Sequence, residues 1–403
     1  MLPLCGRADV SPESNPPPHR LSAGSLRAKI THVDAGELGE RIARAREVVG
    51  RTQGSLGKTL GLDRSAVSRI ERGDRKVSVT ELLAIAETLG RPLAFFVAEP
   101  VPAVVNRRRD GEHAHESNVL LDEELRSFSS DVQELLDMGI VDAVHRESLA
   151  VRSLHTHSDA EQAAVSVRER TDVGRSAAIP DLGQFCELLG LVTFAAALTP
   201  EGPDGGCVEV GTEGAQLGVA LINGQAPSGR RRMTLAHELG HWLTGDAYDH
   251  EASIETEQML NSFAIHLLAP RTGVSALWNK HEGWSKRDRA IAVGAEFRLS
   301  WSAVIGQLRN LGLITMTEYD TLSGIVPRQG EFAKLELVRR DEPAALYLSP
   351  GLVSQVLRAY STEDLTAERT LELLRGTMDE NDLPPIESMT FEHFRESFAG
   401  HGS

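Results

Sequence analysis

Apolar residues between Glu37 and Leu89 recur at intervals of three and four positions, and glycines or polar turns interrupt the series. Such spacing places apolar side chains on one face of each of several short helices. We predict a bundle of four or five helices that ends at Pro92. The positions that define it are Leu38, Ile42, Ala45, Val49, Leu56, Leu60, Val67, Ile70, Leu82, Ile85 and Leu89.

The pattern changes in the middle of the chain. β-Branched and alternating residues at 191–194, 207–210 and 216–222 predict a small antiparallel sheet. Helical spacing comes next, from about Arg231 to Thr244 and from Glu255 to Leu268, where Pro270 stops it. The fold class predicted is multidomain and mainly α, an all-α bundle followed by an α+β domain. The tail adds a strand-like run at 335–338 and helical stretches at 352–360 and 367–374.

A polar stretch from Asn106 to Asn118 separates the bundle from the rest of the chain and places a boundary near residue 100. Residues 122–150 again have helical spacing, and we expect them to form a connector. The predicted divisions are a disordered leader (1–35), the bundle (36–98), a helical connector (99–159), the α+β domain (160–320) and a C-terminal helical extension (321–403).

The composition excludes some classes of protein. Hydrophobic residues make up 41% and charged residues 25% of the 403 residues, and no apolar run approaches the ~20 residues needed to cross a bilayer. The N-terminus contains Pro16, Pro17 and Pro18 and has no apolar core of a signal peptide. Three widely spaced cysteines fit a reducing compartment. We expect a cytoplasmic protein without a membrane contact.

Charge is distributed unevenly along the chain. The formal net charge is −16, yet residues 36–98 contain eleven Lys and Arg against eight Asp and Glu, a local balance of +3 that leaves −19 elsewhere. A basic segment within an acidic chain is typical of a local nucleic-acid contact. The bundle is therefore the candidate DNA-binding part.

The candidate chemistry lies at His237-Glu238-Leu239-Gly240-His241. On a helix, two histidines four residues apart lie on one face and can bind one zinc ion, and the intervening Glu238 can act as general base. An HExxH pattern also arises by chance, so the alternative is two solvent-facing histidines on an amphipathic helix. Zinc is the expected metal, with manganese as the alternative in the cell.

A catalytic zinc site needs a third protein ligand, and Glu257 on the next helix is the favoured candidate. Asn261 stands four residues later, where its amide could orient the Glu257 carboxylate. Glu255 is the rival ligand, while His250 and His266 are weaker alternatives.

These residues belong to a longer resemblance. The segment from Arg232 to Trp242, followed by Glu257, Asn261-Ser262-Phe263-Ala264 and Pro270, resembles the ImmA/IrrE metallopeptidases. The likeness extends over about 160–320, with Met233, Leu260 and Ala269 as mild departures that remove no ligand. It implies a zinc peptidase that cleaves a helix-turn-helix repressor or antitoxin after a stress or prophage-type signal.

The bundle resembles a Cro/repressor-type helix-turn-helix over 36–98, with Gly61 at the turn and residues 64–71 as the helix that enters a major groove. The partner implied is a double-stranded DNA operator. A protein-interaction module is the alternative. The expected base-reading residues are Arg64, Ser65, Ser68 and Arg69. The expected phosphate contacts are Gln53, Lys58, Arg75 and Lys76. Residues 297–308 also have helix-turn-helix character but little positive charge, which favours a packing role.

We therefore predict a DNA-binding regulator that contains a zinc-dependent endopeptidase. Two alternatives stay open: a transcription factor whose peptidase-like domain senses a ligand or metal, and an antitoxin-like partner of a neighbouring toxin. The oligomeric state is open as well, a homodimer included. The strand at 219–223 is the expected edge for an extended substrate peptide.

Overall fold

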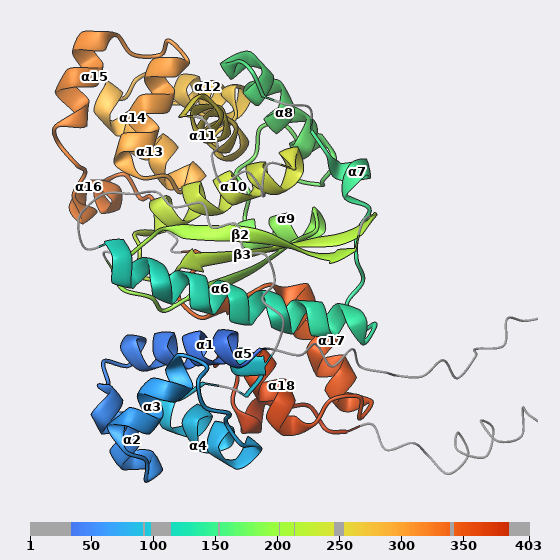
Figure 1. Ribbon diagram of the computed structural model, residues 1–403. Coiled ribbons are helices and arrows are strands. Elements are labelled where there is room, and N and C mark those ends of the chain that lie inside the picture. The colour runs from blue at the N-terminus through green and yellow to red at the C-terminus, as the bar shows by residue number, and fades with distance from the viewer. Residues whose placement is uncertain are drawn as a thin grey trace, which may run out of the picture.

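The computed structural model (Figure 1) describes residues 34–91, 93–97, 114–151, 154–200, 202–212, 214–245, 254–338 and 342–386. Five helices form the N-terminal bundle, as the apolar spacing predicts. They are α1 (Ala35–Val48), α2 (Gln53–Leu60), α3 (Arg64–Glu71), α4 (Val79–Leu89) and α5 (Leu93–Val97). Their apolar faces meet in a core that includes Ile42, Leu56, Val67, Ile85 and Phe96.

The rest of the structure is built around a four-stranded sheet with the order β2-β3-β1-β4. Its strands are β1 (Leu191–Ala196), β2 (Gly205–Thr212), β3 (Ala215–Asn223) and β4 (Tyr347–Leu348). β2 and β3 pair antiparallel as a hairpin, whereas β1 and β3 pair parallel. The predicted small sheet is thus present, but it is mixed rather than antiparallel, because the β2–β3 hairpin brings β3 beside β1 in the same direction.

Helices cover both faces of this sheet (Figure 1). One face packs on α6 (Ala114–Asp137), α17 (Pro350–Ser361) and α18 (Ala367–Leu373), and the other on α9 (Leu182–Leu188) and α10 (Ser228–Thr244). Successive side chains of β3 point to opposite faces of the sheet. Val219 and Leu221 pack on the side of α6, and Ala220 and Ile222 pack on the side of α10. A strand buried on both faces explains its continuous apolar sequence.

Eight more helices complete the described part of the structure, most of them beyond α10, whereas α7 contacts β3. They are α7 (Arg146–Leu149), α8 (His157–Glu169), α11 (Ile254–Leu268), α12 (Arg271–Lys280), α13 (Lys286–Phe297), α14 (Trp301–Asn310), α15 (Met316–Ser323) and α16 (Gln329–Lys334). The 3₁₀ turn η2 spans Glu380–Asp382. Among the helices of the described part, none is long and apolar enough to cross a membrane.

Three expectations change in the structure. The expected connector contains α6, whose Leu121, Leu125 and Phe128 are fully buried against the sheet. No strand forms at 335–338, because Leu335 closes the last turn of α16 and Val338 is exposed. The expected substrate-binding strand at 219–223 is flanked by β1 and β2, so neither of its edges is open to a peptide.

The N-terminal bundle lies against α6, on the side of the sheet away from α10 (Figure 1). Arg91, just after α4, pairs with Glu123 of α6, and Glu123 is almost completely buried. Arg375 from the C-terminal segment contacts Glu124 and Asp131 on the same helix. α6 therefore connects the bundle, the sheet and the C-terminal segment.

Candidate metal centre and DNA-binding surface

α10 holds both histidines of the HExxH pattern. Its apolar face, with Leu235, Leu239 and Trp242, is buried on the sheet. His237 and His241 are separated by one turn on a neighbouring face of the helix, as the four-residue spacing requires. Both imidazoles are buried, and their ring centroids are 4.8 Å apart.

The Glu257 carboxylate from α11 lies against these two imidazoles. His241 Nε2 is 3.1 Å from His237 Nε2, and the Glu257 oxygens are 3.2 Å from His237 Nε2 and 3.5 Å from His241 Nε2. Ligands at zinc bond lengths of about 2.0–2.2 Å in a tetrahedron lie roughly 3.3 Å from one another. In the described part of the chain, these three residues are the His, Cys, Asp and Glu group whose ligand atoms converge. The donor set and its spacing fit a zinc ion.

Glu238 lies in the same turn of α10 but is enclosed by protein. Only 2% of its surface is exposed, and Oε2 has no hydrogen-bond partner among the described residues. Burial raises the pKa of its carboxyl group, an effect that the neighbouring His241 and His237 oppose. The thiol of Cys207 on β2 donates to the backbone carbonyl of Glu238 at 3.7 Å.

Gly240 allows α11 to approach α10. A Cβ atom at this position would lie 2.9 Å from Cδ2 of Leu260 and 3.1 Å from Cδ1 of Phe263, both on α11. Because the two helices meet here, the first turn of α11 brings Glu257 to the histidines. The Asn261 amide donates to the backbone carbonyl of Glu257 at 2.8 Å, so the residue expected to orient the carboxylate contacts the main chain of the same glutamate.

The N-terminal bundle contains two short helices joined by a tight turn. Thr52 caps α2 and Asp63 caps α3, each by accepting a hydrogen bond from a backbone N–H of the first turn. Gly61 ends α2 in the left-handed region, with φ of 68°, as the sequence predicts. Arg46 of α1 and Gln53 of α2 donate to the buried Glu71 of α3, which fixes the angle between these helices.

The comparisons with known proteins agree with both geometries. Residues 42–96 match the helix-turn-helix family, and residues 186–308 match the IrrE N-terminal-like domain. The chain joins a helix-turn-helix domain to an IrrE N-terminal-like domain of the metallopeptidase type. No match was found among curated proteins.

Among solved structures, the chain is similar to the restriction-modification controller protein C.AhdI from Aeromonas hydrophila, at 34% identity over 16% of this chain and 98% of that one, with a TM-score of 0.16. It is also similar to PlcR of Bacillus thuringiensis in complex with the peptide PapR7 and DNA, at 15% identity, 75% and 96% coverage and a TM-score of 0.17. ComR from Streptococcus suis matches at 11% identity, 85% and 88% coverage and a TM-score of 0.16.

The rival ligands in the IrrE N-terminal-like domain lie elsewhere. Glu255 is exposed and is not part of the converging group. His266 is buried further along α11, where Gln307 Nε2 lies 3.4 Å from its Nδ1. Burial lowers the pKa of His266, and the charge of Glu161 acts in the opposite direction. His250 lies outside the described residues.

Two arginines at the start of α10 bind this end of the helix to neighbouring segments, and these contacts were not predicted from the sequence. Arg231 donates to the carbonyls of Gly224 and Ala226. Arg232 has no exposed surface, donates to the carbonyl of Ile179 and pairs with Glu342 from the C-terminal region. The signal in the sequence was the run of three arginines at 230–232, which is unusual on a helix whose next turns are apolar.

In the helix-turn-helix domain, the predicted base-reading residues lie on α3. Arg64, Ser65 and Arg69 are exposed, and Ser68 is half-buried and accepts from Arg72. Among the predicted phosphate contacts, Lys58 and Lys76 are exposed. Two others have partners within the domain: Gln53 donates to Glu71 at 2.7 Å and Arg75 to Glu81 at 2.6 Å.

Residues 297–308, the second stretch with helix-turn-helix character, pack inside the protein. Phe297, Val304, Ile305 and Leu308 are buried in a core shared with the end of α11. Gln307 donates to the carbonyl of Ala269 at 2.9 Å. This region packs against the C-terminal end of α11, the end of that helix opposite to Glu257.

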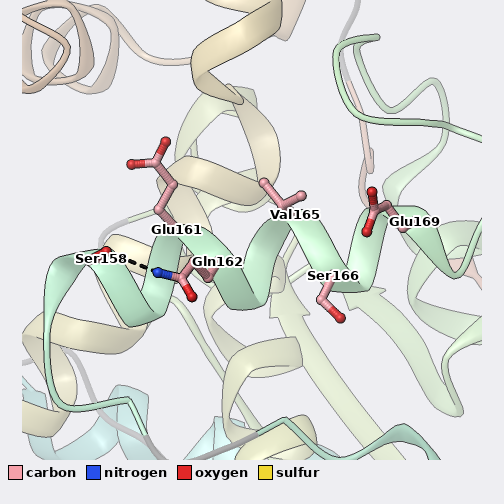
Figure 2. A pocket seen from close by; sticks show the side chains of 6 residues that line it. All are labelled: Ser158, Glu161, Gln162, Val165, Ser166 and Glu169. Carbon is pink, nitrogen blue, oxygen red and sulfur yellow. Dashed lines mark hydrogen bonds between the residues drawn. The ribbon is translucent and has the colours of Figure 1, made fainter.

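A shallow surface pocket of about 280 Å³ runs along α8 (Figure 2). It is lined by Ser158, Glu161, Gln162, Val165, Ser166 and Glu169. None of these is a predicted site residue, and Glu161 is engaged by Arg271 at 2.7 and 2.9 Å. We assign no function to this pocket.

Proposed function

We propose that this protein is a DNA-binding transcriptional regulator whose IrrE N-terminal-like domain is a zinc-dependent endopeptidase. The observation that carries the proposal is the convergence of His237, His241 and Glu257 at 3.1–3.5 Å beside the buried Glu238. Three neutral or anionic donors at tetrahedral spacing leave a fourth position for a reactant, as a catalytic zinc site requires.

His237, His241 and Glu257 would hold the zinc ion. When bound, zinc polarises the scissile carbonyl and makes water a stronger acid. Glu238 takes the proton of the attacking water and delivers it to the nitrogen of the leaving amine. Its enclosed position suits this role, because a carboxylate shielded from bulk solvent is a better proton acceptor than an exposed one.

The DNA-binding half of the proposal rests on α3 and its surroundings. Arg64, Ser65 and Arg69 project from the exposed face of the helix and are the proposed base contacts, with Ser68 beside them. Lys58 and Lys76 are the proposed phosphate contacts. Gln53 and Arg75 are weaker candidates for phosphate contacts, since each already donates to a glutamate of the domain.

The proposed substrate is a helix-turn-helix repressor or an antitoxin, cleaved in response to stress or a prophage-type signal. The resemblance of the segment from Arg232 to Pro270 to the ImmA/IrrE metallopeptidases supports this choice. The combination of a DNA-binding domain and a peptidase-type domain in one chain is consistent with control of transcription by proteolysis.

The test compares zinc-loaded wild type with Glu238→Gln and, as matched control, Glu255→Gln. Each is incubated with the helix-turn-helix proteins of the same genome, and the products are identified by mass spectrometry. The proposal expects cleavage by the wild type and by Glu255→Gln and none by Glu238→Gln. Stoichiometric zinc binding and DNA binding without any cleavage would overturn the peptidase assignment in favour of a metal- or ligand-sensing regulator.

A further inference from the structure

Trp242, directly after the second histidine, occupies a slot in the sheet beside Gly218. A Cβ atom at Gly218 of β3 would lie 2.7 Å from Cδ1 of Leu191, 2.8 Å from Cδ2 of the indole and 3.0 Å from its Cε3. A Cβ atom at Gly190, just before β1, would meet Val144 at 2.5 Å and lie in ordinary contact with the indole, 3.5 Å from Cζ2. The two glycines are themselves joined by the hydrogen bond from Gly218 N to Gly190 O at 2.8 Å. The indole therefore rests against bare backbone.

A hydrogen bond fixes the depth of the indole in this slot. Its Nε1–H donates to the carbonyl of Leu189 at 2.8 Å, and Trp242 is 1% exposed. Leu189 caps the C-terminus of α9, where carbonyl oxygens lack partners within the helix. One side chain thus connects the end of α10 to both the sheet and α9.

We propose that Trp242 is a positioning residue for the metal centre, an inference that rests on the function proposed above. His241 adjoins Trp242 in sequence, and a rigid helix transmits a shift of the indole to His237 and His241 together. Glu257 stands on a different helix, α11, which meets α10 at Gly240. A shift of α10 relative to the sheet therefore alters the 3.2 and 3.5 Å distances between the histidine Nε2 atoms and the Glu257 carboxylate.

Trp301 provides a matched control. Its Nε1–H also donates to a backbone carbonyl at 2.8 Å, that of Leu322, but it lies on α14, away from the metal centre. Trp242→Phe and Trp301→Phe therefore each remove one indole and one hydrogen bond of equal length. Because Trp242 is buried and Trp301 is half-buried, urea unfolding measures the loss of stability of each variant, and a positioning role weakens metal binding only in the first.

A second pair of variants adds bulk instead of removing it. Gly218→Ala places a methyl group against the indole ring and Cδ1 of Leu191, and Gly306→Ala on α14 places one in open space. The double variant Gly218→Ala/Trp242→Phe replaces the indole that the new methyl group meets with a smaller ring. If the slot sets the position of α10, the double variant binds metal more tightly than Gly218→Ala alone.

The experiment measures Zn²⁺ affinity of the full chain by chelator competition and records the d–d absorption of the Co²⁺-loaded protein, with urea unfolding for stability. We expect about tenfold weaker Zn²⁺ binding and a changed Co²⁺ spectrum for Trp242→Phe and Gly218→Ala, with both control variants at wild-type values. Wild-type affinity and spectrum in both site variants would overturn the inference, as would equal losses in site and control variants. If the wild type itself binds no zinc, the proposed function fails as well, which distinguishes the two failures.

Discussion

Glu257 decides whether the two histidines of α10 form a metal site or only an aromatic pair. Its side chain is partly exposed, whereas the histidines are buried, so it is the ligand that solvent reaches. We predict that Glu257→Gln weakens Zn²⁺ binding about 10- to 100-fold, because an amide is a poorer zinc ligand than a carboxylate. Chelator competition measures the affinity. Glu255→Gln, two residues earlier and exposed, is the control, and equal losses in both variants would contradict the assignment.

The helix-turn-helix residues fall into two groups that DNA binding can separate. We predict that Arg69→Ala lowers discrimination between operator and altered operator by about 1–3 kcal/mol, because a base contact is lost. Lys58→Ala should instead weaken binding to all sequences and reduce the salt dependence of log K by about 1, as expected for one phosphate contact. Fluorescence anisotropy at several salt concentrations measures both. Identical behaviour of the two variants would argue against the division.

At this scale the sequence predicts which side chains converge better than it predicts the residues that support them. The histidines and Glu238 follow from the helical period alone, and Glu257 follows from its place in the next helix. The contact of the Asn261 amide with the Glu257 carbonyl was not predicted, because the four-residue spacing suits a bond to the main chain of the preceding turn as well as one to the carboxylate. Arg232 and Glu342 are 110 residues apart, and no local pattern pairs them.

At the level of elements, the site depends on the close contact of α10 and α11 at Gly240. We predict that Gly240→Ala destabilises the protein by about 1–3 kcal/mol, since the new methyl group overpacks against Leu260 and Phe263. It should also weaken zinc binding, because separating the helices moves Glu257 from the histidines. Urea unfolding and chelator competition measure the two effects. Leu260→Ala should cost less stability in the Gly240→Ala chain than in the wild type, because it relieves the overpacking there, and equal costs in the two chains would contradict this contact.

The elements themselves were predictable where their pattern is local. α10 and α11 begin within three residues of the predicted positions and end at the predicted residues, and the three main strands lie where alternation placed them. The parallel direction of β1 relative to β3 was not predictable, because it depends on where the β2–β3 hairpin places β3 in the sheet. β4 has only two residues, too few for a periodic signal, and alternating apolar residues at 335–338 suggested a strand where a helix ends.

The whole molecule places the helix-turn-helix domain and the metal centre on opposite sides of the sheet (Figure 1). α6 covers the face toward the helix-turn-helix domain, and the Arg91–Glu123 pair joins that domain to α6. α10 and α11 lie on the other face. Sequence reasoning treated α6 as a connector, since its apolar stripe shows that it is buried but not which surface buries it. This arrangement determines which polypeptides the metal centre reaches.

We predict that any cleavage of this protein's own helix-turn-helix domain occurs between two molecules, because the sheet and α6 lie between that domain and the metal centre of the same chain. A tagged Glu238→Gln chain, unable to cut itself, should then be cleaved by added untagged wild type. The fraction of wild type cleaved per unit time should rise in proportion to its concentration, as a bimolecular reaction requires. Gel analysis of both chains over a tenfold range of concentration measures this. A concentration-independent fraction, with the Glu238→Gln chain spared, would instead show that the domain leaves α6 and reaches its own metal centre.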